Sequence, residues 1–198
     1  MNLSLLLGKG RSLSLLFSLQ LLILGANAQS HYTSASVNLL VSGTSTLHDW
    51  TMKDVKADCS ATLDLNAAGQ LNALSTLVFS TPVNALKSDH GSMDKNAYKA
   101  LKNDEAPQIS YIMSSVTITR SPEGSTVTCK GKLTIAGTAR DEDLVAVCKT
   151  NADNTITVTG TKNISMQQYN IKPPTFMLGT VKTGNDIVLT FQLTLKKA

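Results

Sequence analysis

Apolar and polar residues alternate with a period of two along most of the chain after residue 30. The apolar positions of the C-terminal segment are Ile187, Leu189, Phe191, Leu193 and Leu195. Mostly polar residues stand between them. Because successive side chains of a β-strand point to opposite faces, this pattern predicts a strand with one buried face.

Recurring turn signals divide the alternating pattern into consecutive strands. The predicted strands are residues 31–41, 45–54, 57–66, 72–84, 107–120, 125–136, 142–150, 155–167 and 185–197. The parity of the apolar positions changes near Ser114 and Ser115, which predicts a β-bulge there. The acidic run Asp141–Glu142–Asp143 is expected in a solvated turn.

One segment, residues 92–102, departs from this pattern and predicts a short helix. Its apolar residues at helical spacing are Met93, Ala97, Tyr98 and Leu101. Ser92 fits the N-cap position, and Pro107 follows shortly after the predicted end. Since the helix has one apolar face, we expect it to lie against the sheet or across one end of it, as part of the core or as a lid.

The strand pattern predicts an all-β fold. Consecutive antiparallel strands leave unpaired edges, which closure into a barrel removes. We therefore expect an antiparallel β-barrel of about eight strands with one short helix. A barrel of this size can be filled by its own side chains or can hold one small ligand, and periodicity alone leaves both open.

The N-terminal residues predict export. Lys9 and Arg11 precede an apolar run over residues 13–25, and Ala26–Asn27–Ala28 is a small-x-small cleavage site. We expect a signal peptide over residues 1–28 and a single mature domain over residues 29–198. The apolar run is shorter than the roughly 20 residues of a transmembrane helix, so stable membrane insertion is not expected.

Charge and histidine spacing exclude several function classes. The chain has a formal net charge of +4, to which the signal peptide contributes Lys9 and Arg11. The lysines are scattered among aspartates, which argues against nucleic acid as a partner. His31, His48 and His90 occur singly, so neither a metal site nor a cofactor is expected.

The segment Thr44–Trp50 is the densest polar cluster and contains a His next to an Asp. Adjacent strand residues point to opposite faces, so His48 and Asp49 are not expected to form a catalytic pair. His48 is a candidate for the mouth of a cavity, and Trp50, the only tryptophan, is a candidate for its wall. We predict a protein without catalytic activity. The alternatives are a barrel enzyme that uses His48 and an interaction module with a filled core.

Three cysteines, Cys59, Cys129 and Cys148, are expected in an oxidising compartment. A hairpin turn centred between Thr138 and Ala139 would set Cys129 directly opposite Cys148. This register predicts a Cys129–Cys148 disulfide and leaves Cys59 unpaired. The alternative is three reduced thiols.

Four motifs carry a family resemblance. They are residues 45–50 (STLHDW), 93–102 (MDKNAYKALK), 133–137 (LTIAG) and 169–184 (YNIKPPTFMLGTVKTG). In this order they resemble the YceI-like proteins, and the likeness extends over residues 31–198. The resemblance implies an exported bacterial protein with a lipocalin-like barrel that binds polyisoprenoid chains. It also implies a periplasmic location and an isoprenoid, quinone or fatty-acid-like ligand.

A ligand pocket is predicted from strand parity together with this resemblance. The expected wall and end residues are Trp50, Tyr98, Leu101, Tyr111, Met113, Leu133, Ile135, Phe176, Phe191 and Leu193, with His48 at the mouth. The loop over residues 169–180 contains two prolines and has an apolar tip at residues 176–178. We expect this tip either to cover one end of the barrel or to form part of a portal.

Overall fold

The computed structural model describes residues 29–122 and 124–198, so the predicted signal peptide, residues 1–28, lies outside the described residues. The strands are β1 (Ser30–Ser45), β2 (Trp50–Asp54), β3 (Asp58–Leu65), β4 (Leu71–Pro82), β5 (Gln108–Ser121), β6 (Gly124–Ile135), β7 (Thr138–Thr150), β8 (Ile156–Ser165), β9 (Thr175–Phe176) and β10 (Val181–Lys197). The helices are η1 (Val83–Ala85), α1 (Gly91–Ala100), η2 (Met166–Tyr169) and η3 (Met177–Gly179).

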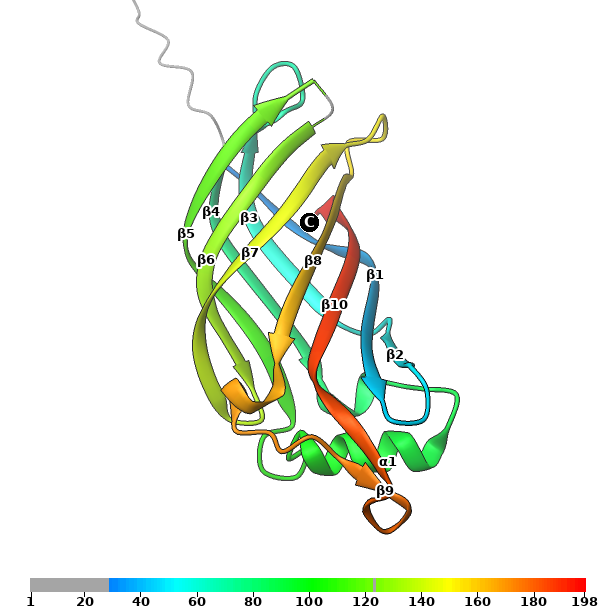
Figure 1. Cartoon of the computed structure of the whole chain (residues 1–198). Helices are drawn as coiled ribbons and strands as arrows, with labels where there is room; N and C mark the ends of the chain where they lie inside the picture. Colours follow the sequence, from blue (N-terminus) through cyan, green and yellow to red (C-terminus); the bar gives the residue numbers. More distant parts are fainter. Residues whose placement is uncertain (1–28, 123) are drawn as a thin grey trace, which may run out of the picture.

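Eight of these strands close an antiparallel barrel, as the sequence predicts (Figure 1). The barrel follows the order β1, β3, β4, β5, β6, β7, β8, β10, and β1 closes it by pairing with β10. The short strand β2 pairs with β1 beyond the β1–β3 ladder, and the two-residue β9 pairs with β10. Helix α1 lies across one end of the barrel (Figure 1).

Side-chain alternation places the core inside the barrel. Along β6, Val127, Cys129, Leu133 and Ile135 are buried while Thr126, Lys130 and Lys132 are exposed. The predicted bulge in β5 is confirmed, because the β5–β6 register shifts between Met113 and Ser115. Period-two patterning therefore identified the inward face correctly on these strands.

Two predicted boundaries are wrong. Strand β1 continues to Ser45 without a turn at residues 42–44, and the connection to β2 is made by residues 46–49. The acidic run 141–143 belongs to β7, which begins at Thr138. The strand accepts these charges because Asp141 binds Lys132 across the ladder, with 2.9 Å between Nζ and Oδ1, and Glu142 is paired with Lys162.

The predicted register of the β6–β7 hairpin is also wrong, and with it the Cys129–Cys148 disulfide. The turn is formed by Ala136 and Gly137, both with positive φ, and Ile135 pairs with Thr138. A two-residue type I′ turn requires positive φ at both positions, and Gly137 adopts it without strain. Cys129 therefore stands opposite Leu144, and all three cysteines are free.

Helix α1 begins at Gly91, with His90 rather than Ser92 at the N-cap. No side chain caps its first turn. Instead the buried carboxylate of Asp94 accepts hydrogen bonds from the backbone N–H and the hydroxyl of Ser88, both at 2.7 Å. This contact fixes the segment before α1 against the helix. Among the described residues, no helix is both long and apolar enough to cross a lipid bilayer.

Candidate functional site

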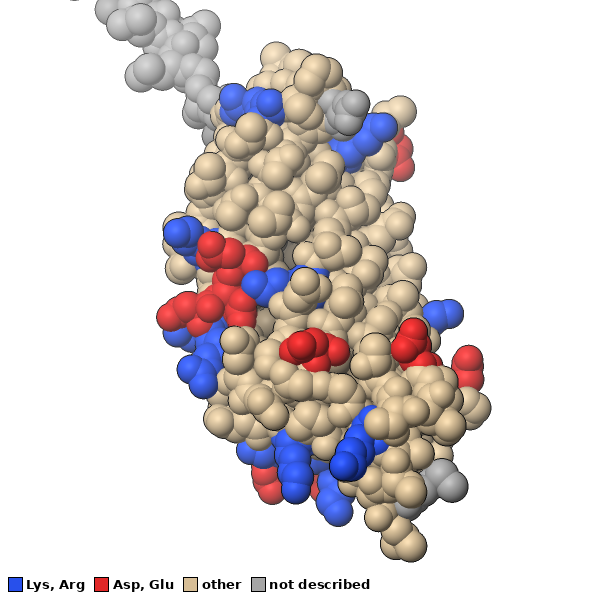
Figure 2. All heavy atoms as spheres, in the orientation of Figure 1, with Lys and Arg blue, Asp and Glu red and all other residues tan. Residues whose placement is uncertain are grey.

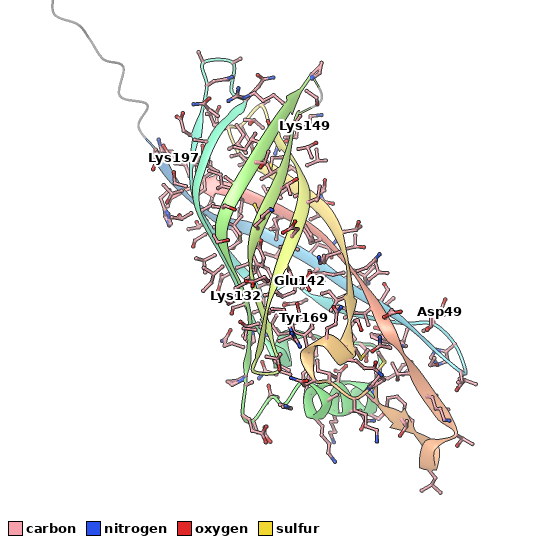
Figure 3. The ribbon with its side chains drawn as sticks, turned by 60° about the vertical axis from the view of Figure 1, so that its left-hand side comes forward. Asp49, Lys132, Glu142, Lys149, Tyr169 and Lys197 are labelled. Carbon is pink, nitrogen blue, oxygen red and sulfur yellow. The ribbon has the colours of Figure 1, made fainter. Side chains whose placement is uncertain are left out.

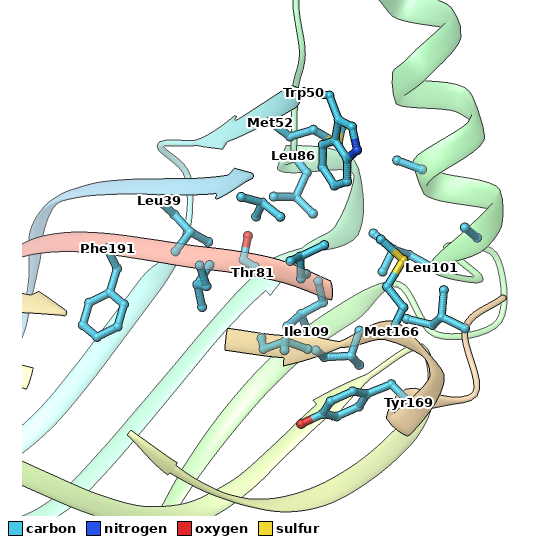
Figure 4. Close-up of a pocket in the computed structure, with 18 of the residues that line it drawn as sticks. Leu39, Trp50, Met52, Thr81, Leu86, Leu101, Ile109, Met166, Tyr169 and Phe191 are labelled. Atoms are coloured by element: carbon cyan, nitrogen blue, oxygen red, sulfur yellow. The ribbon is translucent and has the colours of Figure 1, made fainter. Parts of the chain in front are cut away.

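The barrel encloses an apolar cavity of about 410 Å³ that opens at the α1 end. Most of its wall comes from inward residues of the long strands (Figure 4). Those residues are Leu39, Val41, Cys59, Leu77, Phe79, Tyr111, Cys129, Leu133, Ile135, Leu144, Ala146, Val158, Ile164, Ile187, Leu189, Phe191 and Leu193. The wall thus presents almost only carbon and sulfur to a ligand.

The opposite end of the barrel is filled by its own side chains. Tyr32, Ala61, Leu63, Ile156 and Leu195 are all at most 5% exposed, and none of them lines the cavity. They lie where β1 begins and β10 ends, since Tyr32 pairs with both Ala61 and Lys197. Lys197 and Asp49, labelled in Figure 3, lie toward the closed and open ends. The cavity is therefore a pocket with one mouth rather than a channel.

Three segments surround the mouth. The end of β1 and the β1–β2 connection contribute Ser45, Leu47 and His48. The start of α1 contributes His90, Ser92 and Met93, and the β9–β10 hairpin with the residue before it contributes Pro174, Phe176, Val181 and Thr183. The last turn of α1 and its C-cap residue cover part of the opening through Ala97, Ala100 and Leu101. The helix is thus both a wall and a partial cover of the cavity.

Two aromatic residues of the wall lie flat because a glycine stands opposite each. Trp50 pairs with Gly43, and its indole Nε1–H donates to the carbonyl of Thr44 at 3.0 Å. A Cβ at Gly43 would stand 2.3 Å from the indole ring. Phe191 pairs with Gly160, where a Cβ would stand 2.4 Å from the phenyl ring. The missing side chains let both rings pack against the barrel wall and keep the lumen open.

One buried polar pair lies beside the apolar wall. Thr81, which lines the cavity (Figure 4), donates its hydroxyl to Asp54 Oδ2, and both side chains are buried. Asp54 Oδ1 accepts the backbone N–H of Lys56 at 2.6 Å. Because both oxygens of the carboxylate are satisfied within the protein, this pair ties β2 to β4.

Charged side chains connect β7 and β8 at a seam, the part of these strands nearer the mouth where their backbones are not paired. These strands pair only between Ala146–Thr150 and Ile156–Gly160. Nearer the mouth, Lys162 Nζ lies 2.6 Å from Glu142 Oε2. Tyr169, in η2, donates its hydroxyl to Glu142 Oε1 at 3.0 Å (Figure 3). Burial raises the pKa of Tyr169 above its ordinary value, so its hydroxyl stays protonated as the donor.

The three thiols are not activated: Cys59 and Cys129 are buried, and Cys148 is half-buried. Burial raises the pKa of Cys59 and of Cys148 to about 12, and that of Cys129 to about 11. A thiol with such a pKa is protonated at neutral pH and is a poor nucleophile. The described residues contain no group of three or more His, Cys, Asp or Glu side chains arranged for a metal.

Among residues 29–122 and 124–198, no carboxylate is hydrogen-bonded to His48. Its Nδ1–H donates to the backbone carbonyl of Asp49 at 2.7 Å. Ser45 shapes this turn, since its hydroxyl oxygen accepts the N–H groups of Leu47 and His48, each at 3.2 Å. The geometry therefore gives His48 a position at the mouth but no catalytic pair.

The structure brings most of the predicted pocket residues to one cavity. Those that line it are His48, Trp50, Leu101, Tyr111, Leu133, Ile135, Phe176, Phe191 and Leu193. Tyr98 and Met113 do not line it. The Tyr98 hydroxyl donates to the carbonyl of Leu86 at 2.7 Å and joins α1 to the segment after η1, whereas Met113 lies at the β5 bulge.

Several wall residues were missed by the sequence reasoning. Leu39 and Val41 could have been found from the parity of β1, which continues unbroken past them. Leu86, Met166 and Ile171 lie in or beside short 3-10 helices and loops, where no period predicts the inward direction. The connections that shape the mouth are therefore the least predictable part of the site.

A closed antiparallel barrel with an apolar internal cavity has the architecture of the lipocalin-like barrels. The model of the YceI-like domain matches residues 28–195, and the chain belongs to this family. No curated protein matches the sequence.

Solved structures share the fold at low sequence identity. BcnA of Burkholderia cenocepacia is 15% identical with a TM-score of 0.62, and the match covers 80% of this chain and 95% of that one. A polyisoprenoid-binding domain from Saccharophagus degradans, implicated in plant cell wall breakdown, is 11% identical with a TM-score of 0.59 and coverages of 84% and 98%. The Campylobacter jejuni YceI protein is 19% identical with a TM-score of 0.54 and coverages of 72% and 85%.

Proposed function

We propose that this protein binds one long apolar lipid of the isoprenoid type inside the barrel and carries or stores it. A polyisoprenoid, a quinone tail and a fatty-acid-like chain all present the required surface. The observation that supports the proposal is the cavity, which has an apolar wall and one open end. The other end of the barrel is filled by side chains. A chain with one polar end fits such a pocket with its tail inside and its headgroup at the mouth.

The apolar wall is sufficient for useful affinity. Burying about 400 Å² of apolar ligand surface at roughly 25 cal/mol per Å² contributes on the order of 10 kcal/mol before ordering costs are subtracted. This gain needs no precisely placed polar pair. Polyisoprenoid binding by the Saccharophagus degradans domain, which shares the fold, supports the same ligand class for this chain.

Catalysis is not part of the proposal. The His48 ring is bonded to a backbone carbonyl rather than to a carboxylate. The thiols of Cys59 and Cys129, which line the cavity, have raised pKa values and are protonated at neutral pH. Neither group is prepared to attack or deprotonate a bound lipid.

The proposed compartment is the periplasm, which the protein reaches by export and cleavage after Ala28. The support is the charged, apolar and small-x-small sequence of residues 1–28. Intact mass of the exported protein tests this step, with a chain beginning at Gln29 expected. A mass that includes residues 1–28 would contradict it.

The binding proposal is tested by organic extraction of natively purified protein followed by mass spectrometry. We expect a long-chain lipid in wild type and its loss in Phe191→Asp, which places a charge inside the cavity. The matched control is Val188→Asp, because Val188 is exposed on the outer face of the same strand. Lipid retained equally by wild type, Phe191→Asp and Val188→Asp, or absent from folded wild type, would contradict the proposal.

A further inference from the structure

Two leucines are exposed at the end of the molecule that holds the cavity mouth. Leu178, in η3 at the tip of the β9–β10 hairpin, is fully exposed, and Leu47, in the β1–β2 connection, is 67% exposed. Leu178 also adopts a left-handed conformation, with φ of 57° and ψ of 30°, which is disfavoured for a residue with a Cβ. The chain therefore presents an apolar side chain at a tip where a solvated turn would ordinarily carry Gly or Asn.

The two connections are fixed to each other. The backbone N–H of Thr46 donates to the carbonyl of Lys182 at 3.0 Å, and the N–H of Lys182 donates to the Thr46 hydroxyl at 3.1 Å. The hairpin projects beyond α1 at this end of the barrel (Figure 1). Leu47 and Leu178 thus lie on two neighbouring loops that are hydrogen-bonded to each other, the β1–β2 connection and the β9–β10 hairpin, which together form the rim of the cavity.

The exposed rim is continuous with the cavity. Leu47 lines the mouth although two thirds of its surface is in solvent, and Phe176, two residues before Leu178, also lines the mouth. An apolar surface therefore runs from the outside of the rim to the interior wall. A lipid tail that follows this surface does not have to cross water.

Exposed lysines lie at the same end of the molecule as the apolar rim. Lys95 and Lys99 lie one turn apart on the exposed face of α1, Lys102 follows its last turn, and Lys172 and Lys182 are exposed around β9. Blue side chains gather at this end in Figure 2. The exposed carboxylates near this end include Asp49, Asp89, Asp104 and Glu105, which lie in connections, and Asp186 in β10, whereas Asp94 of α1 is buried. The outward face of α1 itself is basic.

We propose that the rim of the cavity docks on a bilayer that contains anionic phospholipid, with Leu178 and Leu47 inserted between the headgroups. In this position the lysines of α1 lie at headgroup level, where each contributes attraction to negative lipids. The mouth then opens into the membrane, and the ligand exchanges directly between bilayer and barrel. The exchange step rests on the proposed lipid-binding function, but docking itself does not.

Flotation with vesicles tests docking independently of the bound lipid. Vesicles of phosphatidylethanolamine and phosphatidylglycerol are expected to carry wild-type protein at low salt. Leu47→Asp with Leu178→Asp is expected to weaken partitioning at least about tenfold, since burial of a leucine side chain stabilises by at least that factor. Val145→Asp with Val188→Asp, which adds the same two negative charges at exposed positions of the barrel strands, is expected to float like wild type. Circular dichroism establishes that each variant is folded.

A second variant tests the charge. Lys95→Gln with Lys99→Gln is expected to lower flotation at least about fivefold on vesicles with phosphatidylglycerol and to change nothing on pure phosphatidylcholine. Wild type that does not float, or that floats as well after both leucines are replaced, overturns the docking proposal. So does a loss of self-association rather than of flotation in the double-leucine variant, which would assign the rim to a second copy of this chain.

The two proposals fail separately. If docking alone is wrong, wild type still yields extractable lipid but does not float. If lipid binding alone is wrong, Phe191→Asp and wild type float equally and neither yields lipid.

Discussion

The two ends of the barrel are built from the same alternating strands but differ in what fills them. At the closed end, Tyr32, Ala61, Leu63, Ile156 and Leu195 pack against one another and are nearly inaccessible. At the open end, inward residues of the same strands, such as Leu189 and Phe191, remain partly exposed and line the cavity. Strand parity therefore decides which side chains face inward, but local side-chain size and loop cover decide whether the interior is filled.

Because the two ends differ in packing, we expect that shortening an inward leucine lowers the free energy of unfolding by different amounts along one strand. Leu195 and Leu189 share the inward face of β10, at the closed and open ends respectively. Leu195→Ala is expected to lower the free energy of unfolding by about 2 to 5 kcal/mol, because it leaves a void in packed core. Leu189→Ala, which enlarges an existing cavity, is expected to cost less than about 1.5 kcal/mol. Urea unfolding measures both, and equal costs would remove the distinction between the ends.

Gly160→Ala tests whether the position of the Phe191 ring against the wall keeps the lumen open. The added Cβ would overlap the Phe191 ring and the carbonyl of Val145, so we expect a loss of about 1 to 3 kcal/mol and reduced lipid content. Gly91→Ala is the control, because nothing lies within 4 Å of its added Cβ. Thermal unfolding and lipid extraction provide the two readouts. A Gly160→Ala protein with wild-type stability and full lipid content would show that the flat ring is unimportant.

The ion pair at the seam between β7 and β8 is tested by a substitution with a smaller expected effect on stability. Removing Glu142 leaves Lys162 without its carboxylate, although Lys162 keeps its hydrogen bond to the Asp143 carbonyl, and leaves the Tyr169 hydroxyl without its acceptor. Glu142→Ala is therefore expected to cost about 2 kcal/mol. Asp141→Ala, which breaks the exposed pair with Lys132, is expected to cost less than about 1 kcal/mol. Chemical denaturation compares the two, and a smaller loss for Glu142→Ala than for Asp141→Ala would argue against a sealing role.

A final expected effect is a pH dependence from the thiols. Burial raises the pKa of Cys59 and Cys148 from 9.0 to about 12 in the folded chain. The unfolded chain therefore loses these protons first, so stability is intact below pH 9 and falls as the pH rises toward 12. We expect about 1.4 kcal/mol of loss per thiol at pH 10 relative to pH 8. Unfolding curves of Cys59→Ala with Cys148→Ala should show a shallower decline, and an identical decline would assign the effect to other groups.

Much of the fold and part of the site could be predicted from the sequence, for a physical reason. Inward positions such as Leu133, Ile135 and Phe191 follow from period two, which the backbone geometry of a strand imposes. The β6–β7 register did not follow, because it depends on whether Ala136 accepts a positive φ beside Gly137. The exposed tip at Leu178 did not follow either, since its direction depends on contacts between loops that are distant in sequence.

Native mass spectrometry of natively purified protein tests most directly whether the barrel holds a lipid. We expect one bound lipid of long-chain mass per folded chain, released on activation in the gas phase and absent from Phe191→Asp but present in Val188→Asp. A ligand-free mass for folded wild type, or an adduct that survives unchanged in Phe191→Asp, would contradict the claim that the barrel cavity holds the lipid.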